Sequence, residues 1–340
     1  MIGVEVPQAT VEQILVYLDG SPLGEIGVDY AMAVARATGA SILLLNVVDS
    51  SPAAHPRPVD ALGIGIARTQ AAQYLDQLAS HLAEELPGDS ASGQERIRTE
   101  ISEGRAADQI LQIADREKVD LIVLTSHEGP DTRRFQMGST TQKVAQHATQ
   151  SLLVVRAEGD RAMPHHRALE RALVLLDGSI AAESSLPSAL ELARTMGTEI
   201  VLAHILVRPV LPTCEPPTKR DRELLTQLEN RSRELGRAYL RNLERGLRSE
   251  AAYCRAVIKE SESIRQGVLA VAEEEDVDII LLTSHGHTSS ENVVHGGVTQ
   301  QVLMHASRPV WVVQNLHVAT QQSSTIVHSQ APQTQASGPL

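Results

Sequence analysis

The chain has 340 residues, a length that suggests two domains, and 42 % of them are hydrophobic, which is enough to build buried cores. Aromatic residues make up only 2 %, so we expect Ala, Val, Leu and Ile to fill those cores. The formal net charge of -12 argues against nucleic acid or an anionic membrane surface as the main partner.

After a leader at residues 1–10, the first half of the chain alternates strand and helix patterns. Short apolar runs predict five strands, at 14–18, 41–48, 97–101, 120–124 and 151–155. Apolar residues at helical spacing predict four helices, at 25–38, 68–86, 105–118 and 140–148. Gly39 is expected to cap the first helix, and the proline-rich stretch 50–58 to form a surface loop. Continuous apolar strands are typical of a parallel sheet covered on both faces, so we expect a doubly wound α/β domain with ligands beyond the carboxyl ends of its strands.

The second half of the chain repeats the first. LVYLDGS at 15–21 returns as LVLLDGS at 173–179, so that Asp19 and Asp177 lie 158 positions apart. The same offset relates Thr125 to Thr283, Gly138 to Gly296, His147 to His305 and Val154 to Val312. A constant offset over a whole domain indicates an internal duplication. We therefore predict two domains, at 11–158 and 168–314, joined by a short polar link and followed by a disordered polar tail at 315–340.

One stretch of the second half has the features of an anion site. The apolar run 277–282 predicts a buried strand, and Gly286, Gly296 and Gly297 then lead into a helical pattern that begins at Val298. Glycines let backbone N–H groups approach a phosphate, and a helix N-terminus adds unpaired donors. An ordinary strand–loop–helix connection is the alternative, because short glycine spacings alone are weak signals.

Cysteine content and the N-terminal sequence indicate where the protein works. Cys214 and Cys254 are the only two cysteines, so they form no disulfide framework, and we expect reduced thiols. The N-terminal sequence lacks the pattern of a signal peptide, and eighteen apolar residues never run together. We therefore expect a soluble, cytoplasmic protein without a membrane partner.

Three motifs give the chain a resemblance to a known family. DGS follows the first strand of each half, TSHE or TSHG follows the fourth strand, and each half ends in a helix with a histidine and an apolar strand, VAQHATQSLLVV and VLMHASRPVWVV. Together they resemble the universal stress protein (UspA-like) family in its tandem two-domain form. The resemblance implies two tandem doubly wound α/β domains (Rossmann-like, adenine nucleotide alpha hydrolase-like), each a five-stranded parallel sheet flanked by helices. It also implies that the two domains pack as a pseudo-dimer through their final strands, 151–155 and 309–313.

Nucleotide-binding members of that family bind ATP at a loop that reads Gly-x-x-Gly, nine residues, then Gly-Ser or Gly-Thr. The Asp after the first strand and the backbone after the second strand hold the adenosine. The resemblance thus implies nucleotide-binding residues at Asp177, Ile205, Thr283, Gly286, Gly296, Gly297 and Val298 in the second half, and at Asp19, Val47, Thr125, Gly138, Ser139 and Thr140 in the first. The implied cofactor is ATP, with Mg²⁺ as its companion ion.

Both halves depart from the family pattern. In the second half, Thr283 replaces the first glycine, which is tolerable if its φ is negative, and Gly297 replaces the hydroxyl residue at a cost of ~1–2 kcal/mol. In the first half, Thr125 replaces the first glycine and Glu128 the second. A carboxylate about 4 Å from a phosphate repels it by roughly 4 kcal/mol at an effective dielectric of 20, about a thousandfold in affinity. Arg133 and Arg134 could offset that repulsion, but we expect the first site to be degraded.

The sequence leaves several alternative functions to weigh. An interaction or scaffold protein that has lost nucleotide binding, acting through a homodimer or a protein partner, is the main one. An ATP-pyrophosphatase is disfavoured because its Ser-Gly-Gly-x-Asp-Ser loop is replaced here by Leu-Asp-Gly-Ser. A hydrolase triad of Ser139, His127 and Asp19 lacks a nucleophile elbow.

Other singled-out residues have simpler interpretations. The His-x-His pair, His285 and His287, lacks a third metal ligand, so we expect no metal site. His147 and His305 are interpreted as packing or capping residues, and the Asp-Gly pairs as turns unless a ligand uses them. We accordingly expect a stress-response module that binds ATP mainly in its second half as a regulatory switch, with no catalytic residues and at most slow hydrolysis.

Overall fold

The structure, a computed structural model, describes residues 11–49, 61–86, 96–127, 137–157, 169–208, 218–248, 251, 253–284 and 295–314. The first repeat contains, in chain order, β1 (Gln13–Leu18), α1 (Ile26–Thr38), β2 (Ser41–Val48), α2 (Ala61–Glu85), β3 (Ile97–Glu103), α3 (Ala106–Arg116), β4 (Leu121–His127), α4 (Ser139–His147) and β5 (Ser151–Ala157). The second repeat contains β6 (Arg171–Leu175), α5 (Ile180–Glu183), α6 (Leu186–Met196), β7 (Glu199–Val207), α7 (Lys219–Leu247), β8 (Cys254–Ser261), α8 (Ile264–Glu274), β9 (Ile279–Thr283), α9 (Gly297–His305) and β10 (Val310–Val313).

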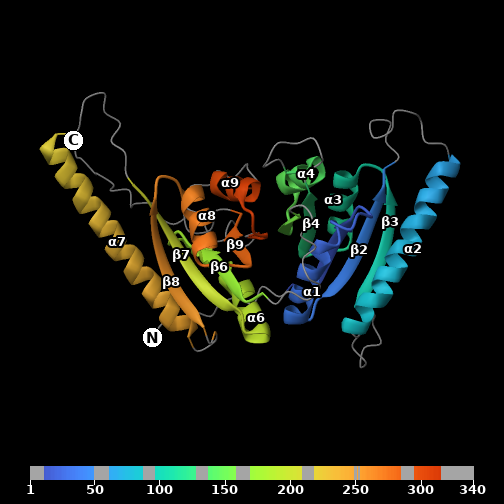
Figure 1. The fold of residues 1–340 in the computed structure, drawn as a ribbon, viewed down its shortest axis with the longest axis horizontal. Coiled ribbons are helices and arrows are strands. Elements are labelled where there is room, and N and C mark those ends of the chain that lie inside the picture. Colours follow the sequence, from blue (N-terminus) through green and yellow to red (C-terminus); the bar gives the residue numbers. More distant parts are fainter. Residues whose placement is uncertain are drawn as a thin grey trace, which may run out of the picture.

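The ten strands that the structure describes form one sheet, in the order β3-β2-β1-β4-β5-β10-β9-β6-β7-β8. The five strands of each repeat are parallel to one another, and the repeats meet where β5 pairs with β10 in the antiparallel direction. At this junction Val154 faces Val310 and Leu153 faces Trp311. The expected pairing of the repeats through their final strands is therefore confirmed, and Figure 1 shows the two halves side by side about this junction.

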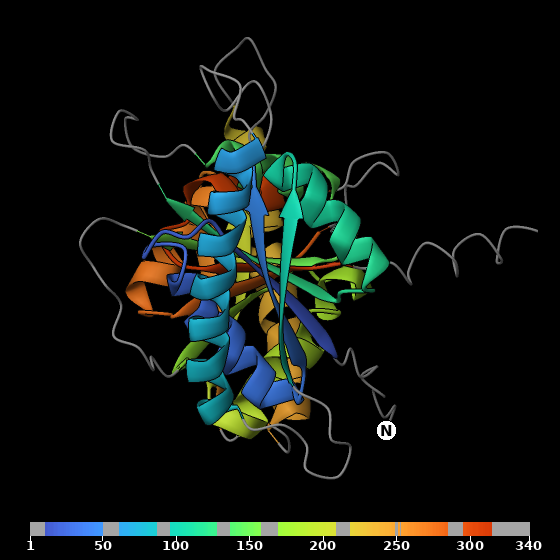
Figure 2. The same ribbon diagram turned by 90° about the vertical axis from the view of Figure 1, so that its right-hand side faces the viewer.

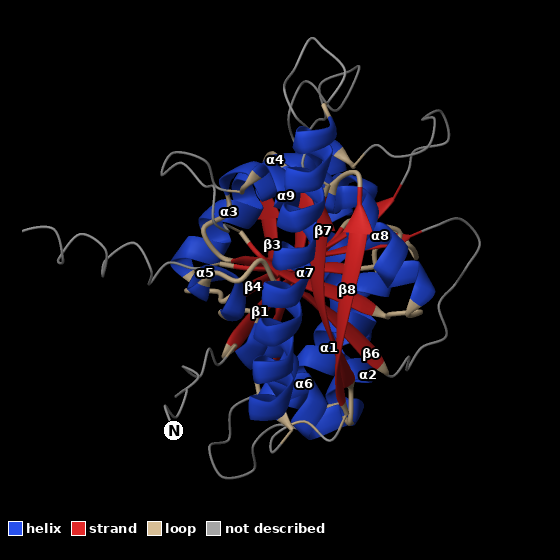
Figure 3. Ribbon diagram, turned by 90° about the vertical axis from the view of Figure 1, so that its left-hand side faces the viewer, coloured by secondary structure: helices blue, strands red, loops and turns tan. Residues whose placement is uncertain are grey.

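Helices cover both faces of the sheet and divide the core into two layers. On one face, α1, α2, α6 and α7 pack against residues such as Val16, Val123 and Trp311. On the other, α3, α4, α8 and α9 pack against the alternate residues, such as Leu15 and Ile122. The alternation follows from the strand geometry, because neighbouring side chains point to opposite faces. Figure 2 shows α2 running along β2 and β3, and Figure 3 shows α7 in the same position over β7 and β8.

The predicted elements agree with the structure except at a few ends. The first helix ends at Gly39, whose φ of 81° confirms the expected cap. α2 begins at Ala61, seven residues earlier than predicted. The prediction missed the first two turns because their apolar residues, Leu62 and Ile66, are exposed and form no stripe that faces the core. The predicted leader, the loop at 50–58, most of the link and the tail lie outside the described residues.

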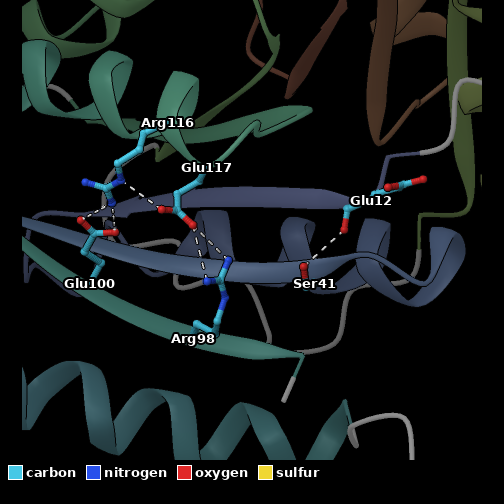
Figure 4. A network of polar contacts seen from close by, with 6 residues as sticks. All are labelled: Glu12, Ser41, Arg98, Glu100, Arg116 and Glu117. Atoms are coloured by element: carbon cyan, nitrogen blue, oxygen red, sulfur yellow. Dashed lines mark hydrogen bonds and ion pairs between the residues drawn. The ribbon is translucent and has the colours of Figure 1, made fainter. Parts of the chain in front are cut away.

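A network of ion pairs joins β3 to the carboxyl-terminal end of α3 in the first repeat. Arg116, at the end of α3, lies 2.6 Å from Glu100 on β3 and 3.0 Å from its neighbour Glu117, and these contacts are drawn in Figure 4. Arg98 of β3 completes the network with Glu117 at 3.4 Å. These contacts join α3 to the outermost strand, and they lower the pKa of Glu117, chiefly through its hydrogen bond from Arg116.

None of the helices that the structure describes combines the length and apolar character needed to cross a membrane.

Candidate functional site

The Asp-Gly-Ser turns follow β1 and β6 and have the same geometry in both repeats. Asp177 Oδ1 accepts hydrogen bonds from the backbone N–H of Ser179 at 2.9 Å and from its hydroxyl at 2.6 Å. Asp19 and Ser21 make the same two bonds at the same distances. Gly178 and Gly20 adopt φ values of 86° and 82°, a conformation that favours glycine. Both aspartates are exposed, so each carboxylate keeps a face open to solvent while it shapes its own turn.

The second strand of each repeat is tied to this turn by a buried or half-buried side chain. Asn46 Nδ2 donates to the carbonyl of Leu18 at 2.8 Å, and the protonated Nδ1 of His204 donates to the carbonyl of Leu176 at the same distance. Each bond holds the carbonyl that precedes the Asp. Sequence reasoning missed Asn46 and His204, although their separation of 158 residues marks them as equivalent positions.

The backbone positions proposed for adenosine contact follow these side chains directly. Val47 and Ile205 are buried, each 8 % exposed, near the carboxyl ends of β2 and β7. Because β6 lies between β7 and β9, the ends of these strands bring Asp177, Ile205 and Thr283 to one edge of the sheet. The first repeat brings Asp19, Val47 and Thr125 together in the same way.

The helices after the fourth strands begin with glycines at this same edge. Gly296 caps α9 and donates its N–H to the carbonyl of Ser284 at 2.7 Å, while Gly138 caps α4 and donates to Ser126 Oγ at 3.2 Å. Both have negative φ values, -62° and -53°, which any residue can adopt. An added Cβ would come no closer than 3.5 Å to a described atom at Gly296, 4.0 Å at Gly138, and would meet none within 4 Å at Gly297. The described fold therefore does not itself require glycine at these positions.

The first turns of α4 and α9 carry the remaining candidate residues. Ser139 and Thr140 open α4, and Gly297 and Val298 open α9. The first intrahelical bonds are made by the N–H groups of Gln142 and Gln300, to the carbonyls of Gly138 and Gly296. The N–H groups before them have no carbonyl within their own helix to bind, which makes both helix ends suitable for an anion.

The threonines at the first glycine position have negative φ, because Lys118 and Asp276 are the only non-glycine residues with positive φ in the described part of the chain. The condition set for Thr283 is thus met. Thr125 has a further role that the sequence did not reveal: its hydroxyl donates to the carbonyl of Gly24 and accepts the N–H of Gly27, both at 3.0 Å. It therefore fastens the end of β4 to the start of α1.

Acidic and tyrosine side chains surround the Asp-Gly-Ser turns. Tyr239 of α7 donates its hydroxyl to Glu183 at 2.9 Å, and burial, followed by the charges of Glu183 and Asp177, raises its pKa. In the first repeat burial, followed by Glu25, raises the pKa of Tyr74. This end of each site therefore presents hydrogen-bonding groups and negative charge, which suits a neutral base better than a phosphate.

Two further sequence interpretations have different outcomes. His147 and His305 each place Nδ1 2.8 Å from the carbonyl four residues earlier, which confirms them as caps of the last turns of α4 and α9. Residues central to the loop interpretation, namely Gly286, Glu128, Arg133, Arg134, His285 and His287, lie outside the described residues.

Comparison with known proteins identifies the family. The sequence profile of the universal stress protein family matches twice, over residues 10–156 and 169–314. The chain belongs to this family. A universal stress protein of Mycolicibacterium smegmatis is 23 % identical over 91 % of this chain and 99 % of its own length, and one of Methanocaldococcus jannaschii is 24 % identical over 43 % of this chain and 94 % of its own. The crystal structure of a universal stress protein from Archaeoglobus fulgidus, 18 % identical, matches the fold with a TM-score of 0.59 over 90 % of this chain and 97 % of that one.

Proposed function

We propose that this tandem universal stress protein is a cytoplasmic stress-response module that binds ATP, with Mg²⁺, mainly in its second repeat and uses the nucleotide as a regulatory switch. Asp177 and the backbone at Ile205 would contact the adenosine. The first turn of α9, with Gly296, Gly297 and Val298, would receive the phosphates, together with Gly286 and Thr283. We propose no catalytic residues, so hydrolysis would be slow at most.

The glycines at the start of α9 carry this proposal. The described fold leaves room for a side chain at Gly296 and Gly297, and neither residue has a positive φ. A ligand that needs the backbone N–H groups at close range accounts for glycine at Gly296, since a Cβ there would stand between them and a phosphate. At the other end of the same sheet edge, the carboxylates of Asp177 and Glu183 would repel a phosphate, so we assign the adenine base to that end.

In the first repeat we propose that the site is degraded. The hydroxyl of Thr125 is already engaged with the backbone of Gly24 and Gly27, so the end of β4 is held in place without a ligand. Glu128 adds a carboxylate to the loop that would hold the phosphates.

Isothermal titration of the full chain with Mg²⁺ and ATP tests the proposal through a matched pair of variants. Gly297→Asp puts a carboxylate at the first position of α9, where it also favours the helix dipole, so a loss of binding would not come from unfolding. Ser139→Asp places the same charge at the equivalent position of α4. We expect one site per chain, abolished by Gly297→Asp and retained in Ser139→Asp, and tighter binding for Gly297→Ser. Absence of binding to the unmodified chain at millimolar ATP, or a loss of binding only in Ser139→Asp, contradicts the proposal.

A second candidate function is an interaction protein that no longer binds nucleotide. The side-chain contacts of Thr125, and the fact that both Asp-Gly-Ser turns are complete through their own hydrogen bonds, favour it, because neither strand tip depends on a ligand. This function predicts a melting temperature that ATP leaves unchanged, together with a stable homodimer or partner complex in light scattering. A monomer that ATP stabilises would exclude it.

A further inference from the structure

A groove lies between α4 of the first repeat and α9 of the second, where the two helices face each other across the junction (Figure 1). Its volume is about 230 Å³. It is lined by Met137, Gln142, Ala145, Gln146, His295, Gln300, Leu303 and Met304. None of these described lining residues belongs to the candidate nucleotide site, so the groove is a separate feature.

The lining comes from equivalent positions of the two repeats. With the offset of 158, the pairs are Met137 and His295, Gln142 and Gln300, Ala145 and Leu303, and Gln146 and Met304. The groove thus sits on the approximate two-fold axis that relates the repeats, and a molecule within it touches both. Only the glutamine pair is the same on both sides, so the two walls offer different chemistry.

The lining selects for an uncharged ligand with an apolar body. Ala145 and Leu303 are 6 % and 2 % exposed and form an apolar floor, whereas Gln142, Gln146 and Gln300 are exposed. Each glutamine amide offers both a donor and an acceptor. Lys, Arg, Asp and Glu are absent from the described lining, so a charged ligand would lose hydration without gaining a partner of opposite charge.

The sulfur atoms and the ring of the lining favour a flat aromatic molecule. The thioethers of Met137 and Met304 adapt their shape and interact favourably with aromatic rings. His295 adds a planar ring that is 7 % exposed. The volume is below the roughly 300–1,000 Å³ of pockets that hold drug-sized molecules, which points to a ligand of about ten non-hydrogen atoms.

Hydrogen bonds and an ion pair to neighbouring elements fix the two helices that form the walls of the groove. Arg156 of β5 donates to the carbonyl of Leu303 at 2.9 Å and also to that of Met304, which fixes the last turn of α9 against the other repeat. Thr299 Oγ1 donates to the carbonyl of Thr283 at 2.9 Å and fixes its first turn. On the other wall, Lys143 of α4 pairs with Asp108 of α3. Walls fixed in this way reduce the ordering cost of binding.

We propose that the groove between α4 and α9 is a binding site for a small, uncharged, aromatic amide, in which the ring lies between the methionines and the amide bonds to the glutamines. Because such a ligand contacts both repeats, it strengthens their pairing. The site does not depend on nucleotide binding, and it exists whether or not ATP binds at the edge of the sheet.

Benzamide is a suitable probe, and the methionine methyl groups report where it binds. In the full chain labelled with ¹³C-methyl methionine, we expect benzamide to shift the Met137 and Met304 signals saturably, with a dissociation constant of about 1 mM. Met137→Leu and Met304→Leu assign the two signals, and the signal of buried Met32 in α1 serves as the internal reference. Benzoate has the same ring and a charge, and we expect at least tenfold weaker binding.

Two kinds of variant separate ligand binding from packing. The double substitution Gln142→Leu and Gln300→Leu keeps exposed side chains of similar size, and losing two hydrogen bonds should weaken benzamide binding about tenfold. Ala145→Leu fills the floor and should abolish it. The proposal is overturned if Met32 shifts as much as Met137 and Met304, if benzoate binds as well as benzamide, or if the glutamine pair can be replaced without effect.

Discussion

The hydroxyl of Thr125 should contribute measurably to the stability of the first repeat. Thr125→Val keeps the shape of the side chain but removes two hydrogen bonds, the one accepted from the N–H of Gly27 and the one donated to the carbonyl of Gly24, both 3.0 Å long. A hydrogen bond contributes about 0.5–1.5 kcal/mol net, so the free energy of unfolding should fall by about 1–3 kcal/mol. Urea unfolding followed by far-ultraviolet circular dichroism measures that difference as a lower midpoint at constant slope.

A double-mutant cycle tests whether this contact also explains the neighbouring glycine. A Cβ added at Gly27 would lie 2.6 Å from Thr125 Oγ1, which is too close for either atom to stay in place. Gly27→Ala should therefore destabilise the chain when Thr125 is present and cost much less when Thr125→Ala has removed the hydroxyl. We expect a coupling of at least ~1 kcal/mol. Additive effects, or a Thr125→Val variant within about 0.5 kcal/mol of the unmodified chain, would refute the reasoning.

Three further predictions rest on single side chains. Burial raises the pKa of Cys254 to about 11, so in a Cys214→Ser background its alkylation at pH 8 should be roughly a hundredfold slower than in the urea-unfolded chain, as a thiol-trapping time course would show. Burial, and then the charges of Asp19 and Asp49, raise the pKa of Tyr17 to about 12. An unfolded tyrosine loses its proton near pH 10, before the folded one does, so Tyr17 should make the free energy of unfolding fall between pH 10 and 12. Tyr17→Phe should reduce that fall in a series of urea unfolding curves measured at increasing pH. Arg156→Met should lower the free energy of unfolding by about 1–3 kcal/mol, because two carbonyls at the end of α9 lose a charged donor, and equal urea midpoints for variant and unmodified chain would contradict this.

Local patterns were sufficient to predict most of the strands and the helix ends that depend on one residue. Ser41–Val48 is mostly apolar, with leucines and the β-branched Ile42, Val47 and Val48, and it forms β2 with the predicted bounds. Gly39 ends α1 because only a residue that tolerates a positive φ can turn the chain there. The duplication predicted the architecture, since two equal α/β units must each bury both faces of a sheet, and their final strands pair as expected.

Contacts between distant residues could not be predicted in this way. The bonds from Asn46 and His204 to the strand that precedes each Asp join residues 28 positions apart, and the bonds of Thr125 cross about a hundred positions. A period in the sequence reports which face of an element is buried but not which polar atoms meet there. The same reason explains why the groove between α4 and α9 was not foreseen, although its lining comes from matched positions of the repeats.

The single chain gives the two candidate sites freedom to differ. The parallel strands of each repeat end at their own edge of the sheet, and within the described residues the only strand pairing between repeats is that of β5 with β10. With one repeat per chain, that pairing would have to form between separate molecules, and each substitution would alter both sites at once. Covalent linkage makes the pairing intramolecular, so a substitution within one repeat can alter one candidate site and leave the pairing of β5 with β10 intact. Because the two repeats can change separately, equivalent positions can carry different residues. Examples are Asn46 and His204, Gly27 and Ser185, and Met137 and His295.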